Sequence, residues 1–105
     1  MTIKEEIKAF KAMTEKMYET FKKKRHDYGQ STTELFNEFG PITMYIKMYD
    51  KMSRFKNLMN NLNNYVEDES IIDTLLDLAN YALITILEYQ KTADRLEVNN
   101  EEQIL

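Results

Sequence analysis

Residues 69–89 read ESIIDTLLDLANYALITILEY, and this stretch decides the fold. Its apolar residues surround most of the circumference of the helix that their spacing predicts, as expected for a helix with neighbours on several sides. They are Ile71, Ile72, Leu75, Leu76, Leu78, Ala79, Ala82, Leu83, Ile86 and Leu87. We therefore expect a central, mostly buried helix that ends near Arg95, followed by a frayed polar tail over residues 97–105.

Three more helical segments are expected before this stretch. An amphipathic pattern covers residues 2–25, a short helix begins at Ser31, and a third helix runs from Pro41 to about Leu62. Gly40 and Pro41 separate the short helix from the third. The chain has two glycines and one proline, too few breakers for an all-β fold. The expected fold is all-α: a compact bundle of three long helices and one short helix.

Length and composition narrow the function classes. The 105 residues predict one domain over residues 1–96, and four helices this apolar indicate a homo-oligomer. With 14 Lys and Arg against 18 Asp and Glu, the net charge of −4 disfavours binding to polymeric nucleic acid. The absence of cysteine excludes disulfides and thiol catalysis and fits a reducing cytoplasm. No apolar run approaches the roughly 20 residues that cross a bilayer, so no membrane partner is expected.

A polar stripe interrupts the apolar helix. Glu69, Asp73, Asp77 and Asn80 fall within about 80° of one another on a helical wheel. Carboxylates are seldom buried without a partner, so a cation is expected to face Asp73 and Asp77. One interpretation is a salt bridge with Arg54, which shares a face of the third helix with Asp50, Asn57 and Asn61, flanked by Lys51. The other is Mg²⁺, because carboxylates one turn apart can share a hard cation.

The break after the first helix also has two interpretations, one structural and one functional. Residues 24–29 read KRHDYG, which is typical of a helix end with cations and a glycine. The same residues also suit a phosphate-contacting corner, in which Lys24 or Arg25 neutralises anionic oxygens and Tyr28 stacks on a base. The helix that begins at Ser31 would add its free N–H groups to this corner.

Four sequence motifs, taken together, resemble one family. They are Lys24-x-x-Asp27-Tyr28-Gly29, then Phe36 and Gly40, then Asp50-Lys51-x-x-Arg54-x-x-Asn57-Leu58, then Glu69-Ser70-x-x-Asp73-Thr74-x-x-Asp77-Leu78-x-x-Tyr81. Over about residues 20–90 the chain resembles the small helical family called "nucleotide modification associated", a domain of unknown function common in phages and prophages. The resemblance implies a phage protein that acts in the cytoplasm of a bacterial host and is associated with nucleotide metabolism.

A more distant similarity is to the all-α nucleoside triphosphate pyrophosphatases, the MazG-like and dimeric dUTPase-like enzymes. Those enzymes hold Mg²⁺ with acidic residues one turn apart on two facing helices, which Asp73 and Asp77 would match. The companion Glu-x-x-Glu is missing here, because Asp50 is followed by Lys51 and Arg54. Fewer carboxylates and more cations suit the holding of a phosphate better than the holding of several metal ions.

Three functions follow as hypotheses. The first is a nucleotide-handling protein that binds a nucleotide or nucleotide-derived signal, with sequestration of that ligand as one form of this function. Its ligand-binding residues would be Lys24, Asp27, Tyr28, Gly29, Lys51, Arg54 and Asn57. The second is a Mg²⁺-dependent pyrophosphohydrolase whose metal ligands would be Glu69, Asp73 and Asp77. The third is a helical module that binds another protein. Whether the protein is an enzyme stays open at this point.

Overall fold

The computed structural model describes residues 1–28, 30–61 and 69–104, and the regular structure in these ranges consists of four helices and no strand. The helices are α1 (Ile3–Tyr28), α2 (Ser31–Phe39), α3 (Ile42–Met59) and α4 (Glu69–Ile104). The predicted all-α fold with three long helices and one short helix is therefore confirmed.

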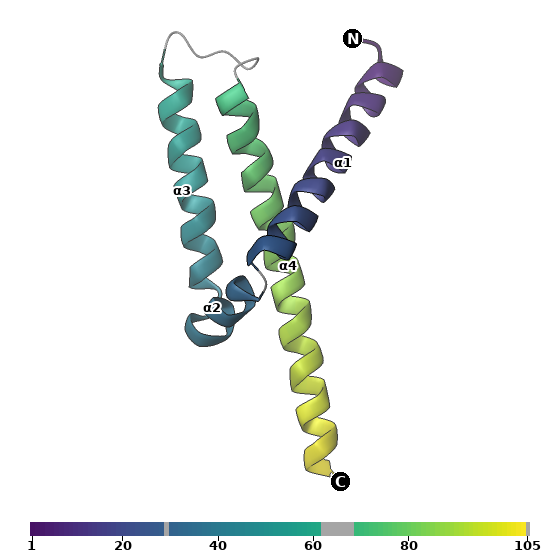
Figure 1. Cartoon of the computed structure of the whole chain (residues 1–105), viewed down its shortest axis with the longest axis vertical. Coiled ribbons are helices and arrows are strands. Elements are labelled where there is room, and N and C mark those ends of the chain that lie inside the picture. Colours follow the sequence, from purple (N-terminus) through teal and green to yellow (C-terminus); the bar gives the residue numbers. More distant parts are fainter. Residues whose placement is uncertain (29, 62–68, 105) are drawn as a thin grey trace.

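The core follows the seam between α3 and α4, which run antiparallel, and α2 closes one end of this pair (Figure 1). Phe36 of α2, Met44 of α3 and Ile71 of α4 are buried. The ring of Phe36 meets that of Tyr89 edge to face, with 5.5 Å between their centroids. This aromatic contact attaches α2 to α4.

Gly40 makes the sharp turn between α2 and α3, as the sequence predicts. Its φ of +83° and ψ of −169° lie in a region that only glycine adopts readily. Its N–H donates to the carbonyl oxygen of Phe36 at 2.8 Å, which closes the end of α2. Pro41 follows at the N-cap of α3, where its missing N–H costs no helical hydrogen bond. The turn lets α3 fold back beside α4.

α1 gives the molecule its open shape. Its C-terminal half crosses α4, and its N-terminal half diverges from the other helices as a free arm (Figure 1). The radius of gyration is 17.6 Å, against about 13 Å for a compact domain of this length. The arrangement is thus more open than the compact bundle that the sequence predicts, because α1 packs along only part of its length.

α4 is the central helix, but the expectation that it is mostly buried is wrong. Leu83 and Ile86 are each more than half exposed, since α1, α2 and α3 leave one side of α4 uncovered. The helix also continues to Ile104, past the end predicted near Arg95. In the same way α1 extends to Tyr28 instead of ending near Arg25. No proline or glycine interrupts either extension.

Length and composition would allow part of α4 to cross a membrane. An 18-residue window within Ser70–Val98 has a mean hydropathy of 1.5, so one stretch is more apolar than the sequence analysis expected, while the absence of a membrane partner stays a prediction. The core helix of a globular bundle satisfies the same criterion. In this structure 17% of the apolar window is buried, and Asp77 and Glu88 within Ser70–Val98 contact side chains of other helices.

Candidate functional site

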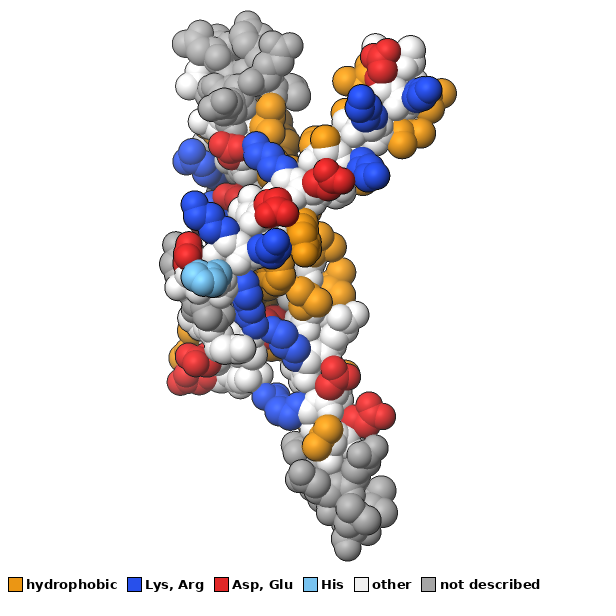
Figure 2. Space-filling view, turned by 45° about the vertical axis from the view of Figure 1, so that its right-hand side comes forward, with side chains coloured by type: hydrophobic (Ala, Val, Ile, Leu, Met, Phe, Trp, Pro, Cys, Tyr) orange, Lys and Arg blue, Asp and Glu red, His pale blue; other side chains and the backbone are white. Residues whose placement is uncertain are grey.

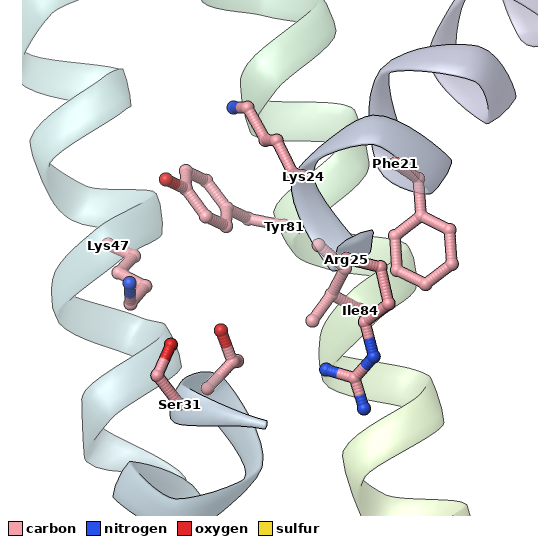
Figure 3. Close-up of a pocket in the computed structure, with 8 residues that line it drawn as sticks. Phe21, Lys24, Arg25, Ser31, Lys47, Tyr81 and Ile84 are labelled. Atoms are coloured by element: carbon pink, nitrogen blue, oxygen red, sulfur yellow. The ribbon is translucent and has the colours of Figure 1, made fainter. Parts of the chain in front are cut away.

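A hollow of about 320 Å³ lies where the end of α1, the start of α2 and the middle of α3 meet above α4, and we call it the basic pocket. It is lined by Phe21, Lys24, Arg25, Ser31, Thr32, Lys47, Tyr81 and Ile84. Figure 3 shows Lys24 and Tyr81 extending from α1 and α4 toward α3, with Lys47 and Ser31 on the opposite side. The volume of the basic pocket lies at the lower end of the range of small-ligand sites, about 300–1,000 Å³.

Three cationic side chains, Lys24, Arg25 and Lys47, line the basic pocket. Lys47 and Arg25 have no carboxylate within salt-bridge distance among the described residues. The ammonium of Lys47 lies over the ring of Tyr81, 5.6 Å from its centroid. Arg25 donates to the side-chain oxygens of Gln30 and Thr33 at 3.4 and 3.5 Å, which are neutral acceptors. The pocket therefore carries positive charge that its own walls do not neutralise.

The first turn of α2 contributes Ser31 and Thr32 to the lining of the same pocket. Gln30 is the N-cap residue of α2 and makes no side-chain capping hydrogen bond. The first helical bond runs from the N–H of Glu34 to the carbonyl oxygen of Gln30, at 2.9 Å. The preceding N–H groups, including those of the pocket residues Ser31 and Thr32, have no acceptor within the helix. Such a helix start favours an anion.

The acidic stripe of α4 faces lysines of two other helices. The carboxylate of Asp77 lies 3.8 Å from Lys24 Nζ and 3.3 Å from Lys51 Nζ. The carboxylate of Asp73 lies 3.9 Å from Lys16 Nζ. The cations that face the stripe are thus three lysines. Intramolecular neutralisation is confirmed, but Arg54 is not the partner.

Arg54 and Asn57 lie elsewhere on α3. The Nε of Arg54 donates to Thr74 Oγ1 at 3.2 Å, one turn of α4 away from Asp77. Both residues line a shallow hollow of about 360 Å³ together with Asp50, Ser53, Leu58 and Asn61. The structure therefore divides the predicted ligand-binding residues. Lys24 is in the basic pocket, Arg54 and Asn57 are in the second hollow, and Lys51 faces Asp77 on the α4 stripe.

Other predicted site residues have only a partial structural account. Asp27 is exposed beside His26, with 3.5 Å between its Oδ1 and His26 Nδ1. Gly29 and the side chains of Tyr28 and Glu69 lie outside the described residues. Among the described residues, no three His, Asp or Glu side chains are grouped to hold a metal ion. Magnesium binding by Asp73 and Asp77 stays a prediction.

Lys47 and Tyr81 are among the pocket residues that the sequence reasoning missed. Lys47 has the helical spacing of Lys51 and Arg54, so the three positions share one face of α3. This spacing was the available signal for Lys47. Tyr81 resembled a residue at the core edge, and only the antiparallel register of α3 and α4 places it under Lys47.

A buried carboxylate beside the pocket was also missed. Glu88 of α4 is 1% exposed, and its Oε1 accepts hydrogen bonds from Thr33 Oγ1 at 2.9 Å and Lys91 Nζ at 3.0 Å. Thr33 Oγ1 in turn accepts from Arg25 at 3.5 Å. The network connects the end of α1 and the start of α2 to α4. It therefore supports the wall that carries Arg25.

Comparison with models of known protein families gives a match. The family model described as "Nucleotide modification associated domain 1" matches residues 24–89, which is more than half of the chain. Comparison with curated proteins and with solved structures gives no match. The matched range begins at Lys24 and includes Lys47 and Tyr81, so most of the basic pocket lies within the family's domain.

Proposed function

The chain belongs to the nucleotide modification associated domain family, and we propose that it binds a nucleotide or nucleotide-derived small molecule in the basic pocket. The observation that carries this proposal is the set of three cations around a pocket with a tyrosine in its wall. Phosphate oxygens would occupy the space between Lys24, Arg25 and Lys47, next to the N–H groups that begin α2.

The apolar side of the pocket supports a base next to these phosphates. Tyr81 offers a π-face, and Phe21 and Ile84 offer apolar contact. Stacking of a base on an aromatic ring contributes about 1–3 kcal/mol and tolerates any base. A base that stacks on Tyr81 would displace the ammonium of Lys47 from the ring and move it toward the phosphates.

The lysines around Asp73 and Asp77 favour binding of a nucleotide without its hydrolysis. Asp73 and Asp77 of the α4 stripe each face lysines, and Asp77 faces two of them. Cations this close to Asp77 repel a divalent ion and attract a phosphate. We therefore propose that the protein holds its nucleotide intact, as a sequestering protein would. The alternative, hydrolysis with Mg²⁺ on Asp73 and Asp77, requires these lysines to move away.

A thermal-stability screen with nucleotides, with and without Mg²⁺, tests this function. We expect a nucleotide at 100 times its Kd to add about 2.7 kcal/mol of stability, which raises the Tm by roughly 10–20 °C. The matching nucleoside, which lacks phosphate, is the control and should shift the Tm little. After denaturation, recovery of the intact nucleotide in stoichiometric amount supports sequestration. Turnover of the nucleotide supports the hydrolase instead.

The substitution Asp77→Asn distinguishes sequestration from Mg²⁺-dependent hydrolysis independently of the stability screen. If phosphates bind the cations directly, loss of this carboxylate frees Lys24 and tightens binding about three- to tenfold, as measured by calorimetry. Asp73→Asn is the matched control, because Asp73 faces Lys16, which is outside the basic pocket. It should leave the Kd nearly unchanged. Loss of binding in both variants, together with loss of a Mg²⁺ requirement, would contradict direct phosphate binding.

A further inference from the structure

We propose that a second copy of this chain covers an apolar strip that runs along the free arm of α1 and the uncovered side of α4. On α1 the strip consists of Ile3, Ile7 and Phe10, and on α4 it consists of Leu83, Ile86 and Leu87. This interface is separate from the basic pocket and goes beyond the proposed nucleotide binding.

The arm of α1 has the sequence of a helix with a partner. Ile3, Ile7 and Phe10 follow the alternating four- and three-residue steps of a heptad seam, and after Thr14 the steps continue with Met17 and Phe21. The C-terminal part of the seam packs on α4, where Met17 and Phe21 are half-buried. The N-terminal part touches no other helix, and Ile7 and Phe10 are both 66% exposed. One continuous seam is therefore only half used within a single chain.

The chain exposes more surface than a compact monomer of its length, and the excess is in the range that a stable homodimer covers. The chain has 8598 Å² of accessible surface, whereas a compact monomer of this length has about 6,200 Å². The excess of about 2,400 Å² compares with the roughly 1,000–2,500 Å² that each chain of an obligate dimer buries. The excess of the whole chain is thus within the range that a second copy can cover.

An apolar hollow on the strip offers a place for a side chain of the second copy. It measures about 200 Å³ and lies where the arm leaves α4, between Tyr18 and Phe21 on one side and Leu83 and Leu87 on the other. Figure 2 shows apolar side chains exposed in this region, beside the crossing of α1 over α4. Pockets of this kind accept the anchor residues that dominate an interface. Phe10 of a second copy is an anchor of suitable chemistry.

The charges around the strip favour a protein partner over a lipid surface. The polar side of the arm carries three lysines, Lys4, Lys8 and Lys11, and three glutamates, Glu5, Glu6 and Glu15. Helices that bind anionic membranes carry an excess of Lys and Arg on their polar face, which is absent here. Mixed charges beside an apolar seam are typical of helices that pair with each other, and a symmetric dimer needs such self-complementarity.

Sedimentation velocity on the full chain tests the proposal. We expect the wild type to sediment as a dimer or a higher oligomer at micromolar concentration. Phe10→Asp should shift it to monomer, because the aspartate would lose its hydration at the interface. Ala12→Asp is the matched control, since Ala12 is exposed on the opposite face of the same helix and the change in charge is equal. It should keep the oligomer.

Two further measurements make the outcome decisive. Circular dichroism should show equal helix content in the wild type and the variants. If Phe10→Asp fails to fold, Ile3→Glu, at the free end of the arm, takes its place and should also give monomer. A wild type that is monomeric at 100 μM, or a Phe10→Asp variant that stays oligomeric with full helix content, would overturn the proposal. Co-flotation of monomeric wild type with phosphatidylserine vesicles would assign the strip to a membrane instead.

Discussion

Reversing the charge of Lys47 is expected to weaken nucleotide binding at least 100-fold. Lys47 lines the basic pocket from α3 and has no carboxylate partner among the described residues, so its charge is available to a phosphate. Two unit charges about 4 Å apart at a protein surface interact with roughly 4 kcal/mol, and Lys47→Glu replaces attraction by repulsion. Even after screening by salt, about 3 kcal/mol of binding free energy should be lost, which corresponds to two powers of ten.

Calorimetric titration of the nucleotide found in the stability screen measures this effect. Lys56→Glu is the matched control, because Lys56 is exposed on the same helix and outside the pocket. The control has the same net charge as Lys47→Glu, so it separates the local contact from the overall charge. Its Kd should stay within about threefold of the wild-type value. Equal losses of affinity in both variants would contradict a ligand beside Lys47.

Truncation of Glu88 is expected to lower the free energy of unfolding. Its buried Oε1 accepts hydrogen bonds from Thr33 and Lys91 and so connects α2 to α4. Glu88→Ala removes both bonds and leaves a cavity at a residue that is 1% exposed. Together these losses should lower the free energy of unfolding by about 3 kcal/mol.

Urea unfolding at fixed protein concentration measures this loss. Glu97→Ala is the control, because Glu97 is exposed on the same helix and makes no ion pair within the described residues. It should change stability by no more than about 0.5 kcal/mol. If the two variants lose equal stability, Glu88 does not connect the helices. A nucleotide added in excess should still stabilise Glu88→Ala, because Glu88 does not line the basic pocket.

The helices could be predicted because each depends on residues three or four positions apart. The apolar pattern of residues 69–89 indicated the central helix, and Gly40 and Pro41 marked the turn before α3. The openness of the bundle could not be predicted in this way. The seam of Ile7 and Phe10 looks the same whether its partner is α4 or a second chain.

The site was predicted in part for a similar reason. Lys24 and the start of α2 are close in sequence, so the corner that they form is a local feature. Lys47 and Tyr81 belong to different helices and meet only because α3 and α4 pair in one register. The same register places Lys51 beside Asp77 and Arg54 beside Thr74.

The sequence by itself determined four helices, their order and a basic corner next to the start of α2. Only the tertiary structure decided that three lysines face the acidic stripe, that Arg54 lies outside the pocket, and that Glu88 is buried. The physical reason is that helical periodicity arises within a few residues of chain. The pairing of charges between helices depends instead on crossing angle and register, which all the packed side chains set together.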